Sequence, residues 1–266
     1  MSRVEKFNPL KASTLSRKRD HERAGRRAEA VPISEITFEE VKRDAVRFGL
    51  ATEVSSQMNA GKEASIFLAH WKGHPIILKA YRLWQTSQAE RRKGFYALEK
   101  MESVAAKEYD VLSACFKATV HVPTPIGRVG NYLTMRFLGD SSDPAHQLKD
   151  VRLEDPEQAM EQVFDEYLIM YRDAKYVHGD LSAYNILWWR NHPWIIDVPQ
   201  AYLVGPWADM KVVVHLLKRD ILNVLSYFKR YGVQGDPDHI LKGFLSEYVP
   251  NNLRNSRELL GVWTNE

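Results

Sequence analysis

Two acids and an amide with fixed spacing constrain this chain more than any other feature of its sequence. Asn185 lies five residues after Asp180, and Asp197 lies twelve residues after Asn185. The interval holds two short apolar runs, Ile186–Trp189 and Trp194–Ile196, which are typical of two short strands. Because a pair of short strands keeps the flanking loops close together, we expect the three polar side chains to converge around one divalent cation.

This spacing suits the transfer of a phosphoryl group. A carboxylate on a loop, Asp180, can accept or orient the proton of a hydroxyl group, while the amide of Asn185 turns back to hold magnesium. Asp197, at the end of an apolar strand, can bridge metal ions that neutralise the β- and γ-phosphates. We therefore predict Asp180 and Asp197 as catalytic residues, and Asn185 and Asp197 as metal ligands. The alternative is a surface loop with two unrelated acids, which the two apolar strands disfavour.

A lysine interrupts an otherwise apolar strand earlier in the chain. Lys79 lies within Ile76–Tyr81, and a buried ammonium group without a counter-charge is strongly unfavourable. Glu108, in the helix expected next, is the natural partner, as in the strand lysine and helix glutamate of kinases. Either residue alone would more often be a surface charge, so the assignment depends on their order relative to Asp180.

Two further segments complete a predicted nucleotide site. A turn of small residues between the first two strands could cover the nucleotide with its backbone N–H groups, and without the other motifs it would be an ordinary hairpin turn. The residues predicted to bind the cofactor there are Asn59, Ala60, Gly61, Lys62, Glu63 and Ala64. Met135, Arg136 and Leu138 occupy the place of an interlobe hinge, where backbone groups of Arg136 and Leu138 could pair with adenine.

The order of apolar patterns predicts an α+β fold with two lobes. Short runs rich in Val, Ile, Phe and Ala indicate three antiparallel strands between residues 50 and 82, followed by a helix and two more strands. Helical patterns dominate later, beginning with Asp155 as N-cap and Pro156 in the first turn. We predict a flexible basic tail, an N-lobe with an antiparallel sheet and a helix, and a mostly helical C-lobe over residues 1–33, 34–138 and 139–266.

Together these motifs resemble the RIO-type atypical serine/threonine protein kinases over about residues 51–231. The phrases that carry the resemblance are Gly61-Lys62-Glu63-Ala64, Leu78-Lys79-Ala80-Tyr81, Leu148-Lys149-Asp150, Val177-His178-Gly179-Asp180-Leu181-Ser182-x-Tyr184-Asn185, Ile196-Asp197-Val198-Pro199-Gln200 and Lys218-Arg219-Asp220. The first 50 residues are too few for a winged helix plus a tail, so we expect the branch without that N-terminal domain.

The resemblance implies a reduced, bilobal protein-kinase-like fold that uses ATP with magnesium or manganese. It implies Asp180 as the catalytic acid or base, Asn185 and Asp197 as metal ligands, and Lys79 as a phosphate contact. It also implies autophosphorylation or ATP hydrolysis, and a role in maturing the small ribosomal subunit. Val198 follows Asp197 where ordinary kinases have Phe-Gly, and only 69 residues remain, so no standard activation segment is expected.

Charge and composition bear on partners and location. Residues 1–30 carry nine basic and four acidic side chains, so the basic excess of the chain belongs to this tail. We predict that the tail contacts ribosomal RNA or a pre-ribosomal particle, with a solvated leader as the alternative. No apolar run is long enough to cross a membrane and no secretory signal is evident, which predicts a cytoplasmic protein.

Two other functions remain open from the sequence. Small-molecule kinases of the aminoglycoside and choline type share the H-G-D-L-x-x-x-N phrase followed by I-D, although Gly61-Lys62-Glu63 and Val198-Pro199-Gln200 speak against them. A nucleotide-gated assembly factor without catalysis would need the same pocket. The sequence does not identify the protein substrate.

Overall fold

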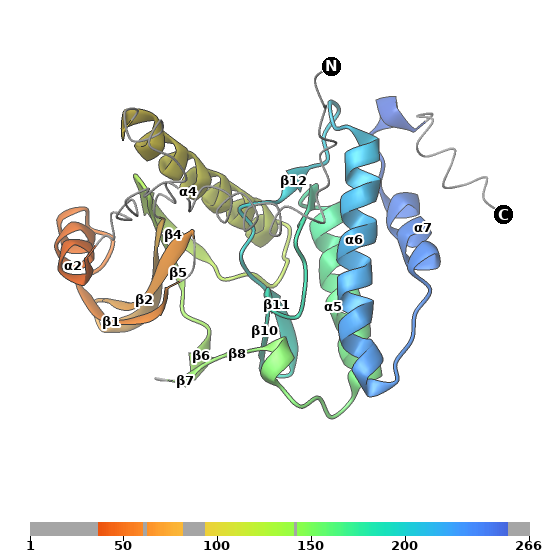
Figure 1. Ribbon diagram of the computed structural model, residues 1–266, viewed down its shortest axis with the longest axis horizontal. Coiled ribbons are helices and arrows are strands. Elements are labelled where there is room, and N and C mark those ends of the chain that lie inside the picture. The colour runs from red at the N-terminus through yellow and green to blue at the C-terminus, as the bar shows by residue number, and fades with distance from the viewer. Residues whose placement is uncertain (1–36, 61–62, 82–93, 141–142, 255–266) are drawn as a thin grey trace, which may run out of the picture.

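The computed structural model describes residues 37–60, 63–81, 94–140 and 143–254. In Figure 1 the sheet lies at one end of the molecule, and the helices of the C-terminal half, drawn in green to blue, lie at the other. The predicted start of order near residue 34, the basic tail, and the loop residues Gly61 and Lys62 fall outside the described residues. The predicted α+β fold of a reduced kinase type is confirmed.

Five antiparallel strands form the sheet of the N-lobe, in the order β1-β2-β3-β5-β4. Their bounds are Glu53–Ala60, Ala64–Trp71, His74–Tyr81, Tyr132–Arg136 and Pro125–Val129 in that order. The tight turn between β2 and β3 places Lys72 and Gly73 at positive φ, which suits the right-handed twist of a hairpin. The register pairs Lys79 of β3 with Ile66 and Leu133, so the lysine stands in a central strand.

Two helices flank this sheet. Helix α2 (Phe38–Arg47) begins with a capping box in which the Thr37 side chain and Glu40 satisfy each other's backbone N–H groups. Helix α4 (Gly94–Lys117) carries Glu108 and ends with residues such as Leu112 and Cys115 in the large core of the C-lobe. Helix α2 shares a separate, smaller core with strands β1, β2, β3 and β5. Residues on both sides of position 138 therefore share the large core. The division into lobes at residue 138 stays a prediction.

The C-lobe is built mainly from helices α5 (Pro156–Arg172), α6 (Met210–Phe228) and α7 (Pro237–Glu247), which lie side by side in Figure 1. Asp155 caps α5 by accepting the Gln158 N–H group, as predicted. The remaining strands are β6 (Gly139–Asp140), β7 (Asp143–Pro144), β8 (His146–Gln147), β9 (Tyr176–Val177), β10 (Ile186–Trp189), β11 (His192–Ile195) and β12 (Tyr202–Leu203). Short 3-10 helices lie at Leu148–Asp150, Lys229–Tyr231 and Asn251–Leu253.

The predicted hairpin after Asn185 is present. Strands β10 and β11 pair antiparallel, with Ile186 opposite Ile195, and β8 adds a third strand on the other side of β10. Only β12 and a loop separate Asp197 from α6, so no standard activation segment is present there. No helix in the described part of the chain has both the length and the apolar character needed to cross a membrane.

Candidate active site

A cavity of about 630 Å³ lies between the sheet of the N-lobe and the loops of the C-lobe. Most of the predicted site residues line it: Asn59, Glu63, Ala64, Lys79, Glu108, Met135, Arg136, Leu138, Asn185 and Asp197. Ala60 and Asp180 do not line the cavity, and Gly61 and Lys62 lie outside the described residues. Most of the residues that were predicted from the spacing and order of the motifs therefore line one cavity.

Three charged side chains meet in this cavity. The Lys79 ammonium group lies 2.9 Å from Glu108 Oε1 and 2.7 Å from Asp197 Oδ1. Burial alone would lower the pKa of Lys79, but the Coulomb attraction of both carboxylates raises it. Burial likewise opposes the ionisation of Asp197, yet the Lys79 charge holds the pKa of Asp197 below its ordinary value. The Lys79 ammonium group therefore links the sheet, α4 and the loop of Asp197.

Glu108 is the most enclosed member of this group. Its side chain is only 1% exposed, and burial raises its pKa while the neighbouring Lys79 charge opposes that shift. Removal of Lys79 would leave this carboxylate buried without a cation. The partner expected for the strand lysine is the one that the structure supplies.

Asp180 and Asn185 are held together at the edge of the cavity. The Asn185 side-chain amide donates to the Asp180 carbonyl at 2.8 Å and lies 3.4 Å from Asp180 Oδ2. With its nitrogen directed at Asp180, the amide leaves its oxygen as a possible metal ligand. The Ile196 N–H group donates to the Asn185 carbonyl at 3.0 Å, which fixes the strand end next to Asp197.

Asp197 has an unusual backbone conformation for an aspartate. Its φ of 61° lies in the left-handed region, a costly conformation that clusters at functional sites. The side chain is half exposed, and one carboxylate oxygen contacts Lys79. Together with the Asn185 amide oxygen, it offers the hard oxygen ligands that magnesium prefers. The donor set therefore fits a magnesium ion.

The loop of Asp180 is held by Asp220, a residue whose role was not predicted from the sequence. Asp220 of α6 is fully buried and accepts hydrogen bonds from the Gly179 N–H at 2.8 Å, the Leu181 N–H at 3.1 Å and the Tyr167 hydroxyl at 2.6 Å. Burial raises the pKa of Asp220, and these hydrogen bonds oppose the shift. The two N–H groups flank Asp180, so Asp220 fixes the backbone that presents the Asp180 carboxylate.

His178 orients the two segments that carry Asp180 and Asp197. Asp180 N–H donates to its Nδ1 at 3.2 Å, which leaves Nε2 to donate to the Ile196 carbonyl at 3.0 Å. The ring is completely buried. It connects the loop of Asp180 to the strand end before Asp197, so both predicted catalytic acids depend on one hydrogen-bonded imidazole.

The hinge is more constrained than the sequence suggested. The Arg136 N–H donates to the Thr124 carbonyl, and the Leu138 carbonyl accepts the Ala145 N–H, each at 2.9 Å. Two of the backbone groups in the adenine-pairing prediction, the Arg136 N–H and the Leu138 carbonyl, are therefore already engaged within the protein. The Arg136 side chain lies over the rings of Trp189 and Trp194, with centroid distances of 5.4 and 6.0 Å.

Comparison with known proteins agrees with this geometry. The RIO domain model matches residues 67–240. The RIO-type serine/threonine-protein kinase Rio1 of Thermoplasma acidophilum is 41% identical over 134 residues, which cover 50% of this chain and 68% of that protein. Rio1 of Haloferax volcanii is 32% identical over 196 residues, covering 69% of this chain and 66% of the relative. Human serine/threonine-protein kinase RIO1 is 28% identical, and the match covers only 35% of it.

A solved structure shows the same arrangement of elements. A Rio2 kinase from Chaetomium thermophilum aligns with a TM-score of 0.65 and 20% sequence identity, covering 92% of this chain and 78% of that one. At this level of identity the likeness concerns the fold. A second structure of the same kinase gives a TM-score of 0.64 over 95% of this chain.

Proposed function

This chain belongs to the RIO domain family, and from that membership and the geometry of its cavity we propose that it is an ATP-dependent phosphotransferase, acting as a serine/threonine kinase, an ATPase or both. The predicted family is thereby confirmed, while the branch without a winged helix stays a prediction. One observation supports the activity most strongly: Lys79 contacts Glu108 and Asp197 at once, in the cavity that Asn185 also lines.

Each side chain in the cavity has a part in this proposal. Lys79 would neutralise phosphate charge, and Glu108 would hold the Lys79 ammonium group in place. Asn185 and Asp197 would bind magnesium, or manganese, which favours the same oxygen ligands. The bound ion would neutralise charge that develops on the transferred phosphoryl group. Asp180 would orient the hydroxyl or water molecule that attacks.

Hydrolysis could proceed through Asp197 itself. One of the similar structures is described as a Rio2 kinase complex with ADP, Mg²⁺ and a phosphoaspartate. The half-exposed carboxylate of Asp197 would take the phosphoryl group from ATP, releasing ADP, and water would then free inorganic phosphate and restore the acid. Chemical trapping of an acyl phosphate on the wild-type chain tests this step, and failure to trap it during active turnover would remove it.

The activity itself is tested with purified full-length protein, ATP and magnesium. We expect phosphate release or autophosphorylation that is lost in Asp197→Asn and Asp180→Asn. Asp165→Asn is a matched control, because Asp165 is exposed on α5 away from the cavity. Equal turnover in all three variants would contradict the assignment. Turnover that rises only with amino sugars or amino alcohols would favour a small-molecule kinase, and tight ATP binding without single-turnover chemistry would favour a nucleotide-gated factor.

A role in maturing the small ribosomal subunit in the cytoplasm is the cellular part of this proposal. It is supported by the family and by the basic residues of the tail, including Arg17, Lys18, Arg19, Arg23, Arg26 and Arg27. Removal of a basic side chain that binds an RNA phosphate should reduce the slope of the salt dependence of RNA binding by about one unit. Deletion of residues 1–30 should therefore weaken binding to ribosomal RNA and flatten its salt dependence, and unchanged binding would contradict the tail's role.

A further inference from the structure

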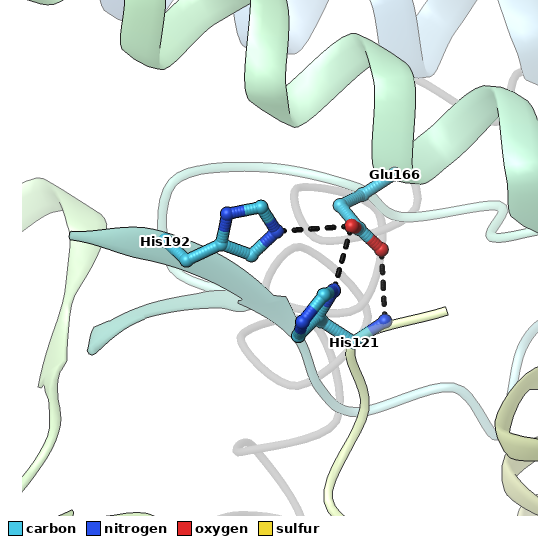
Figure 2. A group of neighbouring side chains, drawn as sticks. All are labelled: His121, Glu166 and His192. Atoms are coloured by element: carbon cyan, nitrogen blue, oxygen red, sulfur yellow. Dashed lines mark hydrogen bonds and ion pairs between the residues drawn. The ribbon is translucent and has the colours of Figure 1, made fainter. Parts of the chain in front are cut away.

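A second polar cluster lies outside the nucleotide cavity. Figure 2 shows His121, Glu166 and His192 with both imidazole rings directed at one carboxylate. His121 Nδ1 lies 2.7 Å and His192 Nε2 lies 3.0 Å from the same oxygen, Glu166 Oε1. None of the three residues lines the ATP cavity. The cluster has no part in the activity proposed above.

In the part of the chain that the structure describes, no lysine or arginine forms an ion pair with the carboxylate of this cluster. The Glu166 side chain is only 6% exposed, and among the described residues its ion-pair partners are the two histidines. Its other oxygen accepts the backbone N–H of His121 at 2.8 Å. A carboxylate removed from water needs a positive partner, and a divalent cation held between the three side chains would supply one. The site therefore favours a bound cation.

The ligand atoms are also close enough to share an ion. Two histidine nitrogens and one carboxylate oxygen lie within 4.8 Å of one another. Tetrahedral zinc bonds of about 2.0–2.2 Å place ligand atoms roughly 3.4 Å apart, so small side-chain rotations suffice to admit the metal. The Trp194 ring packs edge-on against the His121 ring, with the ring centroids 4.9 Å apart. Both histidine side chains are about a third exposed or more, which gives the ion access and room for a water ligand.

We propose that His121, Glu166 and His192 bind a divalent transition-metal ion of the zinc class. Imidazole nitrogens suit zinc and its neighbours, whereas magnesium prefers oxygen ligands alone. The site would be distinct from the magnesium ligands Asn185 and Asp197. Its chemistry is that of three protein ligands and an open position that water can fill.

The ion would join three segments that are far apart in the sequence. His121 lies between α4 and β4, Glu166 lies on α5, and His192 lies on β11. The His121 carbonyl already accepts the Ile195 N–H at 2.8 Å, so the metal would strengthen an existing junction. His121 follows the end of α4 closely, and α4 carries Glu108, the partner of Lys79. The bound ion would therefore fix the end of this helix. A structural role of this kind does not depend on ATP turnover.

The test is metal binding by full-length, tag-free protein after treatment with a chelator. Titration with Zn²⁺ in excess Mg²⁺ should show one tight site, and Co²⁺ should give the intense visible absorption of low-coordinate cobalt. His121→Gln and His192→Gln should each weaken binding by more than about 100-fold, since loss of an outer-shell partner alone costs about 10- to 100-fold. His239→Gln is the matched control, because His239 is exposed on α7 and should bind Zn²⁺ as the wild type does.

A second measurement does not depend on how the variants fold. Crystals of the wild-type protein soaked in Zn²⁺ should give an anomalous scattering peak between the three side chains. A peak only at Asp197, or no peak and no saturable binding, would overturn the proposal. Unchanged affinity in a His121→Gln/His192→Gln double variant with wild-type circular dichroism would overturn it as well.

Discussion

The two walls of the nucleotide cavity are built differently. The upper wall ends in β1, an edge strand that is exposed along most of its length and has two register shifts against β2. The lower wall is a loop whose backbone is tied to the buried Asp220 and His178. Catalytic side chains need fixed positions, whereas backbone N–H groups that cover phosphates tolerate varied sequence. Substitutions in the lower wall should therefore reduce activity and stability far more than substitutions in β1.

Lys79 is the strongest test of this comparison, because it belongs to the upper sheet yet contacts Asp197 of the lower wall. We expect Lys79→Met to reduce kcat by about 100-fold or more, as loss of a preorganised charge does. It should also lower the free energy of unfolding by about 3–5 kcal/mol, because Glu108 is left buried without a cation. Phosphate-release kinetics and urea unfolding measure the two effects.

A double variant separates these two effects. Lys79→Met/Glu108→Gln removes both buried charges, so it should regain much of the stability while remaining inactive. Recovery of ATP turnover in the double variant would mean that Lys79 serves only to balance Glu108. The lysine would then belong to the scaffold and not to the catalytic set.

Asp220→Ala examines the lower wall directly. It leaves the Gly179 and Leu181 N–H groups and the Tyr167 hydroxyl without their acceptor, at about 1–3 kcal/mol for each buried donor that stays unpaired. We expect a loss of at least about 3 kcal/mol in unfolding free energy and a fall in kcat larger than any change in KM. Asp165→Ala on the exposed face of α5 should change neither by much. Wild-type kcat in a stably folded Asp220→Ala protein would show that the loop holds its shape without this residue.

Several features of the cavity and of the fold could be predicted from the sequence. The spacing of Asp180, Asn185 and Asp197 predicted a shared site because strands of fixed length carry the chain out and back. Lys79 and Glu108 were paired correctly because a charge in an apolar strand demands a partner. Fold class followed from periodicity, and the predicted strands Ile186–Trp189 and Trp194–Ile196 lie within two residues of β10 and β11.

Other features depended on contacts that spacing does not encode. The signal for Asp220 was present, since it shares a helical face with the buried Leu217 and Val224 of α6, but its partners lie about 40 to 50 residues away. Glu166 and His192 likewise meet only through the packing of α5 against β11, and His121 joins them because its carbonyl accepts the Ile195 N–H group. Helix α7 was not predicted. The use of the Arg136 N–H by Thr124 could not be read from the order of the hinge residues.

Cys115 lies near the C-terminal end of α4 and reports on the rigidity of the core there. The side chain is buried in the core of the C-lobe, and burial raises the pKa of its thiol from 9.0 to about 12. Between these values the unfolded chain loses the proton and the folded chain keeps it, so stability should fall as pH rises. The slope attributable to this group is at most about 1.4 kcal/mol per pH unit above pH 9.

The matched variant isolates that slope from other titrating groups. We expect the stability difference between wild type and Cys115→Ala to be constant below pH 8 and to shrink between pH 9 and 10.5. Alkylation of Cys115 should be correspondingly slow in the folded protein and fast in urea. Rapid alkylation at pH 8 without denaturant would show that the end of α4 is mobile and is not held rigidly in the core of the C-lobe.

The smallest effect is expected in the upper wall. Asn59 lines the cavity at the exposed end of β1, where its backbone pairs with Ile66. If this segment covers phosphates with its N–H groups, Asn59→Ala should change kcat by less than about threefold and unfolding free energy by less than about 0.5 kcal/mol. A larger fall in kcat would show that the amide side chain itself binds phosphate. The upper wall would then share in the catalytic set, and the contrast between the two walls would lie in their stability alone.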